Sequence, residues 1–209
     1  MLLSQVPGRP GLVCALFPAR AFLYNEPQQG TQPEARMGKG LLIVNTGDGK
    51  GKTTAALGLA LRAMGQGLKV CMIQFLKGSW KYGELESAKR FEDLLEWHVR
   101  GRGFTWQSGN IEEDKRVARE AWDFARSVIA QNRHQMVILD ELTYLITYGV
   151  LDCADVVSCL ANRPPDMHVV VTGRGAAPEL VAIADLVTEM SLVKHPFEQG
   201  VKAQKGIEF

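Results

Sequence analysis

The feature that most constrains this fold is an apolar segment that leads into a glycine-rich loop and then into a helical pattern. Leu41 to Val44 (LLIV) is a strand candidate, and Thr46 to Thr54 (TGDGKGKTT) follows it. Thr53 to Met64 is then rich in alanine and leucine and stops before a glycine. Such a loop can turn backbone N–H groups toward one anion, and the helix N-terminus adds the positive end of its dipole. The sequence therefore predicts a phosphate-binding loop.

Two side chains in this loop carry the predicted chemistry. Lys52 supplies positive charge for phosphate oxygens, and Thr53 has the hydroxyl expected to bind Mg²⁺. The usual pattern, G-x-x-x-x-G-K-[ST], has glycine where this chain has Thr46. The alternative is a glycine-rich turn that binds nothing. It is disfavoured because strand, loop, Lys-Thr pair and helix occur in the required order.

An acidic pair follows a second apolar run. Val137 to Leu139 leads directly into Asp140 and Glu141. The carboxyl ends of parallel strands form the ligand crevice of an open α/β sheet, so we expect these acids to face the loop's Mg²⁺. The alternative is that one acid only caps the following helix. The two motifs together predict an ATP or GTP site and leave open which bond is broken.

The rest of the pattern predicts a single α/β domain over residues 38–209. Short apolar runs alternate with helical patterns, which is typical of a mainly parallel sheet with helices on both faces. Residues 112–131 place apolar side chains at helical spacing and charges opposite them, so we predict an amphipathic helix there. Besides the two runs above, the strand candidates are Val70 to Ile73 and Val169 to Val171, with weaker ones at 96–99 and 186–190.

Residues 1–37 differ in composition from the rest. They hold five of the nine prolines, so sustained helix or central strand is not expected. We predict a flexible extension. Because Met37 stands directly before the patterned region, one hypothesis is that the gene start is mis-assigned; N-terminal sequencing of the native protein would decide it.

Composition limits the partners. The 209 residues have a formal net charge of +1, so no global field favours nucleic acid or an anionic membrane. No run of eighteen apolar residues suggests a transmembrane helix. The four cysteines show no C-x-x-C spacing, and we expect reduced thiols, mostly in the core, in a cytoplasmic protein.

Two further loops are candidate ligand contacts. Gly101 to Trp106 (GRGFTW) puts two large aromatic residues on a polar loop, where they either fold back onto the core or form a platform for a flat ligand. Thr172 to Gly175 (TGRG) delivers an arginine at a strand end. That arginine is suited to holding a phosphate, and the alternative is a turn with a solvated side chain.

These segments together resemble the ATP:corrinoid adenosyltransferases of the BtuR/CobO/CobP family. The resemblance covers residues 40–209. The segments that carry it are Thr46 to Gly58, Gln74 to Gly78, Gly103 to Trp106, Leu139 to Tyr144, Thr172 to Gly175 and the tail from Val193. The family's phosphate loop has the same shortened form, and the resemblance implies a P-loop NTPase-like (RecA-like) fold.

The resemblance implies transfer of the 5′-deoxyadenosyl group of ATP to Co(I) of a corrinoid, with release of triphosphate. It implies that Thr53 and Glu141 hold Mg²⁺, with Asp140 as a further candidate ligand. It also implies that Phe104 and Trp106 occupy the lower face of the corrin and keep its axial base from cobalt. The expected nucleotide contacts are Gly47, Asp48, Gly49, Lys50, Gly51, Lys52, Thr53, Thr54 and Arg174. The expected catalytic residues are Lys52, Thr53, Glu141, Phe104 and Trp106.

The family resemblance also implies an oligomeric state and an electron donor. The resemblance implies a homodimer that receives electrons from a flavoprotein reductase, and that binds ATP reversed relative to ordinary P-loop enzymes. Two alternatives stay open at this point. A P-loop phosphotransferase or NTPase would release ADP or GDP, and a nucleotide-sensing regulator would bind ATP without turnover.

Overall fold

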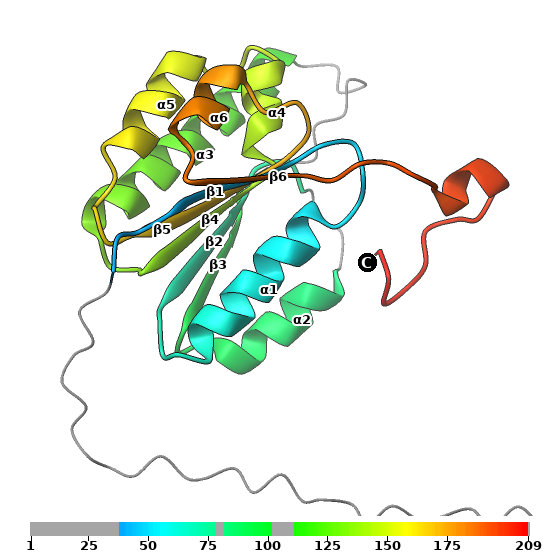
Figure 1. The fold of residues 1–209 in the computed structure, drawn as a ribbon, viewed down its shortest axis with the longest axis horizontal. Helices are drawn as coiled ribbons and strands as arrows, with labels where there is room; N and C mark the ends of the chain where they lie inside the picture. The colour runs from blue at the N-terminus through cyan, green and yellow to red at the C-terminus, as the bar shows by residue number, and fades with distance from the viewer. Residues whose placement is uncertain (1–37, 78–81, 102–110, 209) are drawn as a thin grey trace, which may run out of the picture. The chain divides into compact units, whose positions relative to one another are not determined.

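Among the described residues, six parallel strands form the central sheet of one compact unit (Figure 1). The computed structural model describes residues 38–77, 82–101 and 111–208. The strand order is β3-β2-β4-β5-β1-β6. The strands are β1 (Leu42–Thr46), β2 (Val70–Gln74), β3 (Leu95–Val99), β4 (Met136–Asp140), β5 (His168–Thr172) and β6 (Leu186–Glu189). Every strand candidate in the sequence is confirmed, including the two weaker ones.

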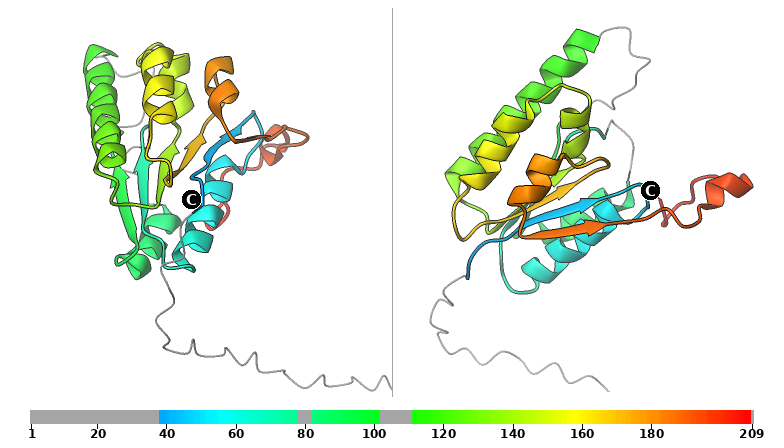
Figure 2. Two further views of the ribbon diagram at one scale, coloured as in Figure 1. Left: turned by 60° about the vertical axis from the view of Figure 1, so that its left-hand side comes forward. Right: turned by 45° about the horizontal axis from the view of Figure 1, so that its top comes forward.

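Helices cover both faces of the sheet (Figures 1 and 2). One face carries α1 (Lys52–Met64), α2 (Gly83–Ala88) and the 3-10 turn η1 (Lys89–Phe91). The other carries α3 (Ile111–Gln131), α4 (Leu142–Thr147), α5 (Cys153–Ala161) and α6 (Pro178–Ile183). A second 3-10 turn, η2 (Pro196–Gln199), lies in the C-terminal tail. The predicted fold class, α/β of the P-loop type, is confirmed.

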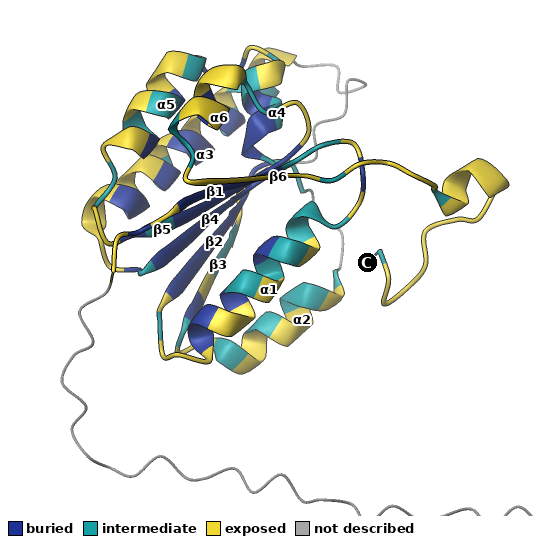
Figure 3. Ribbon diagram, viewed as in Figure 1, coloured by how far each residue is buried: buried dark blue, intermediate teal, exposed yellow. Residues whose placement is uncertain are grey.

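The core has two halves because strand side chains alternate between the faces of the sheet. In β2, Cys71 and Ile73 pack toward α3 and its neighbours, whereas Val70 and Met72 pack toward α1. Strands β1, β2, β4 and β5 are buried along most of their length (Figure 3). Burial on both sides explains why the sequence shows continuous apolar runs in place of alternation.

The topology places the candidate site. The six described strands all point the same way, so the loop after β1 and the acids at the end of β4 lie at one edge of the sheet. Strand β5 separates β1 from β4 and brings its own loop between them. Residues 36–209 form one compact unit.

Several details differ from, or add to, what the sequence predicted. The long helix α3 buries all six of its predicted apolar residues, Ala118, Ala121, Trp122, Ala125, Val128 and Ile129. Helices α2, α4, α5 and α6 were not predicted, because six to nine residues are too few for a clear periodicity. Cys71 is a buried core thiol as expected, but Cys153 and Cys159 are only partly buried. Within the described ranges, no helix has both the length and the apolar character needed to cross a membrane.

Candidate functional site: a phosphate loop facing an acidic strand end

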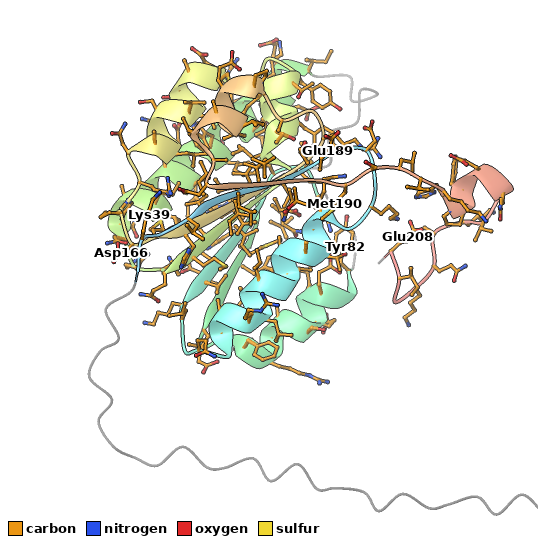
Figure 4. The ribbon with its side chains drawn as sticks, in the orientation of Figure 1. Lys39, Tyr82, Asp166, Glu189, Met190 and Glu208 are labelled. Atoms are coloured by element: carbon orange, nitrogen blue, oxygen red, sulfur yellow. The ribbon has the colours of Figure 1, made fainter. Side chains whose placement is uncertain are left out.

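The glycines of the loop after β1 have backbone and packing roles. Gly47 and Gly51 have φ of 93° and 107°, a region that favours glycine. A Cβ on Gly49 would lie 2.6 Å from the Ser191 carbonyl oxygen, and one on Gly47 would lie 2.5 Å from that of Met190. The Gly49 N–H donates to the carbonyl oxygen of Met190, a residue labelled in Figure 4, at 2.6 Å. The chain after β6 therefore braces the loop, a packing contact that only small residues permit.

Lys52 lies where the loop closes. Its Nζ donates to the carbonyl oxygens of Gly47 and Gly49 at 2.7 and 2.6 Å. Burial, and next the positive charge of Arg174, lower the pKa of Lys52. An anion in the loop would oppose both effects, so Lys52 is placed to gain from a bound phosphate.

Arg174 reaches the same site from the loop after β5. The Thr143 hydroxyl donates to the Arg174 carbonyl oxygen at 2.7 Å, and the Ala176 N–H donates to Thr46 Oγ1 at 3.2 Å. Thr46, which departs from the usual motif, thus has a structural use: its side chain ties the phosphate loop to the arginine loop. The Arg174 side chain is exposed, and its Nε lies 3.9 Å from Asp48 Oδ1.

Asp140 is fully buried and accepts three hydrogen bonds. Oδ1 accepts from the hydroxyls of Thr53 at 2.8 Å and Thr172 at 2.6 Å, and Oδ2 accepts from Gln74 Nε2 at 3.0 Å. The structure therefore joins the acidic strand end to the loop threonine through a direct hydrogen bond. Thr53 lines the cleft, whereas Asp140 is buried behind it.

Glu141 begins α4 in an unusual backbone conformation. Its φ of 67° is left-handed, which is uncommon for a residue other than glycine. The Glu141 N–H donates to Thr172 Oγ1 at 2.9 Å, and its side chain makes no capping hydrogen bond to α4. Burial, followed by the charge of Asp140, raises the pKa of Glu141 to about 7. Local strain and a raised pKa in one residue are typical of functional sites.

A cleft of about 660 Å³ collects these groups. Lys77 forms part of another wall, where its Nζ donates to Glu84 at 3.0 Å and lies 4.2 Å from the centre of the Tyr82 ring. The sequence analysis assigned no role to Lys77 and Glu84 in this wall, or to the C-terminal residues 206–208 that also line the cleft. The residues that line the cleft are Gly49, Lys50, Gly51, Lys52, Thr53, Thr54, Leu57, Lys77, Gly83, Glu84, Ser87, Glu141, Tyr144, Arg174, Gly206, Ile207 and Glu208.

The structure brings most of the expected site residues together. The loop residues from Gly49 to Thr54, Glu141 and Arg174 line one cleft, and Asp140 lies behind Thr53. Gly47 and Asp48 belong to the same loop but do not line the cleft. Phe104 and Trp106 lie outside the described residues.

The raised pKa of Glu141 predicts a pH dependence of stability. The folded chain holds a proton on Glu141 up to about pH 7, whereas the unfolded chain releases it near the ordinary value of 4.5. Without nucleotide, the free energy of unfolding should therefore fall as pH rises through this interval, by up to about 3 kcal/mol. Urea unfolding between pH 5 and pH 8 measures the slope.

The matched variant is Glu141→Gln, which should lose this contribution to the slope. A Glu198→Gln variant, changed at an exposed carboxylate of η2, should keep it. Equal pH profiles for the wild type and Glu141→Gln would show that Glu141 does not titrate as the structure indicates.

These features define a class of protein. An all-parallel sheet, a Lys-Thr loop at a helix N-terminus and a buried aspartate on the loop threonine are the signature of P-loop nucleotide-binding proteins. The flagellar accessory protein FlaH of Methanocaldococcus jannaschii has the same fold, with a TM-score of 0.50 over 73% of this chain and 72% of that one, at 13% identity.

The sequence comparisons identify the family. The model for ATP:corrinoid adenosyltransferase BtuR/CobO/CobP matches residues 38–209. Corrinoid adenosyltransferases from Sinorhizobium sp. and Pseudomonas aeruginosa are 46% and 45% identical to this chain, covering 82% and 84% of it and 81% and 87% of their own lengths. That of Escherichia coli strain K12 is 45% identical over 84% of this chain and 89% of its own. The chain belongs to the ATP:corrinoid adenosyltransferase family and is an enzyme of cobalamin biosynthesis.

Proposed function

We propose that the cleft beside the phosphate loop binds ATP with Mg²⁺ and presents its C5′ carbon to the Co(I) of a corrinoid. The observation that carries this proposal is the convergence of Lys50, Lys52 and Arg174 with Thr53 and Glu141 around one cleft. The charge is local, because the whole chain has a formal net charge of only +1. A triphosphate is the part of the substrate that needs such a cluster.

In this reaction the protein itself forms no covalent bond to the substrates. The electron pair of Co(I) attacks C5′, the C5′–O bond breaks, and its electron pair leaves with the triphosphate. Since Co(I) is already a strong nucleophile, no general base or protein nucleophile is required. The protein must hold C5′ in line with cobalt and stabilise charge on the leaving triphosphate, and Lys52 and the loop N–H groups are suited to the second task.

The donor set fits Mg²⁺. Mg²⁺ prefers oxygen ligands and keeps several waters, often binding through one or two protein groups plus substrate phosphates. The Thr53 hydroxyl and the Glu141 carboxylate would hold it, with Asp140 supporting Thr53 from behind. When bound, the ion would neutralise charge on the triphosphate. With a pKa of about 7, Glu141 is partly protonated at neutral pH without a cation, and a nearby cation would favour its charged form.

The remaining proposals concern partners. We propose a cytoplasmic homodimer that receives electrons for Co(II) reduction from a flavoprotein. An exposed edge supports association: every residue of β6 is exposed, and Leu186 and Val187 are followed by the largely exposed Val193 and Phe197. Light scattering would measure the oligomeric state, and a monomer at micromolar concentration would contradict the dimer.

The experiment that tests the function is incubation with ATP, Mg²⁺ and chemically reduced cobalamin. We expect the corrinoid spectrum to show a carbon–cobalt product and an assay to find one triphosphate per product. Release of ADP and phosphate without a carbon–cobalt product would instead favour a P-loop NTPase. Tight ATP binding without any product would favour a nucleotide sensor.

An ion pair between the C-terminal tail and the phosphate loop should modestly weaken ATP binding, so removing it should strengthen binding. Glu208 Oε2 lies 2.7 Å from Lys50 Nζ, so the carboxylate competes with a phosphate for this lysine (Figure 4). The pair is partly exposed, and such pairs contribute about 0.2–1 kcal/mol. Glu208→Gln should therefore tighten ATP binding by up to about fivefold in isothermal titration calorimetry. Glu198→Gln on the same tail is the control, and unchanged or weaker binding by Glu208→Gln would contradict the competition.

A further inference from the structure

We propose that Gln74, held by Trp97, is a positioning residue that orients Asp140 and, through it, the Thr53 hydroxyl toward Mg²⁺. The inference rests on the proposed Mg²⁺–ATP site. Neither Gln74 nor Trp97 belongs to the phosphate loop or to the acidic pair. Both come from the half of the sheet that lies beyond β4, on strands β2 and β3.

The side chains at the carboxyl ends of three adjacent strands form a continuous polar row. Gln74 of β2 is in register with Asp140 of β4, and Asp140 is hydrogen-bonded to Thr172 of β5. All three residues are fully buried. Polar groups at such depth are costly unless each is hydrogen-bonded, so the bonds between them decide how each is oriented.

Trp97 sets the orientation of the Gln74 amide. The indole Nε1–H can only donate, and it lies 3.1 Å from Gln74 Oε1. The carbonyl end of the amide therefore faces Trp97, which leaves Nε2 to donate to Asp140 Oδ2 at 3.0 Å. The donor-only indole fixes an assignment that is ambiguous for most glutamines.

Thr172 is oriented from the opposite side. Its oxygen accepts the Glu141 N–H, so its hydroxyl hydrogen is free to donate to Asp140 Oδ1. Asp140 is thus held by a donor on each carboxylate oxygen, Gln74 on one and Thr172 on the other. In this fixed position Oδ1 also accepts the hydroxyl hydrogen of Thr53.

The direction of the Thr53–Asp140 hydrogen bond affects how Thr53 can bind a cation. Because the hydrogen of Thr53 points at Asp140, the lone pairs of its oxygen stay available for a cation at the loop. If Gln74 could not donate, one oxygen of Asp140 would lose its partner and the carboxylate could rotate toward other donors. Side chains that support metal ligands in this way typically change metal affinity by roughly 10- to 100-fold when they are replaced.

The test measures the cation directly. Mn²⁺ is used in place of Mg²⁺, and its binding to the protein–ATP complex is followed by electron paramagnetic resonance. We expect Gln74→Met to weaken Mn²⁺ binding by roughly 10- to 100-fold. Trp97→Phe, which keeps an aromatic ring but removes the donor, should weaken it by a smaller factor. ATP affinity in EDTA, measured by calorimetry, should change less than about twofold in both variants.

A control variant separates positioning from packing. Met72 is fully buried on the same face of β2, two residues before Gln74, and is in register with Ile138. Met72→Leu changes the packing but no hydrogen bond, and it should keep wild-type Mn²⁺ affinity. If Gln74→Met does not fold, as judged by circular dichroism, Trp97→Phe decides the question alone.

Two outcomes would overturn the inference. One is unchanged Mn²⁺ affinity in the variants while the wild type shows cation-dependent ATP binding. The other is an equal loss of ATP affinity with and without cation, which indicates a merely structural role. A wild-type protein whose ATP binding ignores the cation would instead refute the proposed Mg²⁺ site itself, so the two failures are distinguishable.

Discussion

A Lys52→Met protein is expected to lose roughly 10²- to 10³-fold in the rate of adenosyl transfer. The Lys52 ammonium lies at the closure of the phosphate loop, within 2.7 Å of two loop carbonyl oxygens. It is the loop cation that is partly buried, so its charge is screened less by solvent than that of Lys50. Charge that builds on the leaving triphosphate would lose this stabilisation.

The measurement is single-turnover adenosylation with Mg²⁺–ATP and an excess of chemically generated Co(I) cobalamin. Lys89→Met is the matched control, because Lys89 lies in η1 and pairs with Glu86 at an exposed position. Circular dichroism should show that both variants are folded. Wild-type turnover in Lys52→Met would remove the lysine from the proposed mechanism.

Replacing both Phe104 and Trp106 by alanine is expected to abolish adenosylation when the corrinoid is supplied as Co(II) with a reductase. The expectation rests on the resemblance to the family, which implies that these two residues keep the axial base from cobalt. A cobalt without that σ-donor accepts an electron more easily, because the acceptor orbital is lower in energy. ATP affinity should be unchanged, because the groups proposed to hold the triphosphate, Lys50, Lys52 and Arg174, are intact in this variant.

The control for this double variant is the same assay with the corrinoid supplied as Co(I). Chemically reduced Co(I) bypasses the step that the aromatic residues are proposed to assist, so the variant should recover much of its turnover with Co(I). Unchanged turnover with Co(II) and reductase would refute the assignment. Equal losses with Co(II) and with Co(I) would indicate that the loop is needed for corrinoid binding as a whole.

Most of the fold was predictable from local pattern. The strand candidates and helix α3 match the structure because a buried parallel strand and an amphipathic helix each leave a direct signature in a few consecutive residues. The short helices α4 and α6 leave no such signature, since one and a half turns show too little periodicity. Their positions depend on packing against β5 and α5.

The phosphate loop was also predictable, but the sequence explains only in part why its residues are needed. Sequence alone explains the glycines by their approach to an anion. The structure adds that Gly47 and Gly49 lie against the backbone of Met190 and Ser191, well over a hundred residues later in the chain. Thr46 seemed a departure from the motif, and its bond to Ala176 shows what a side chain at that position contributes.

The sequence by itself determined the class of site: a loop with Lys52 and Thr53, and two acids at the end of a strand. It could do so because these groups are adjacent in the chain and their chemistry is local. Only the tertiary structure decided which acid accepts the Thr53 hydroxyl, that Gln74 and Trp97 support that acid, and that Glu208 reaches Lys50. The physical reason is distance along the chain. Thr53 and Asp140 are 87 residues apart, and Gln74 and Asp140 are 66 apart, so no local pattern records their contact.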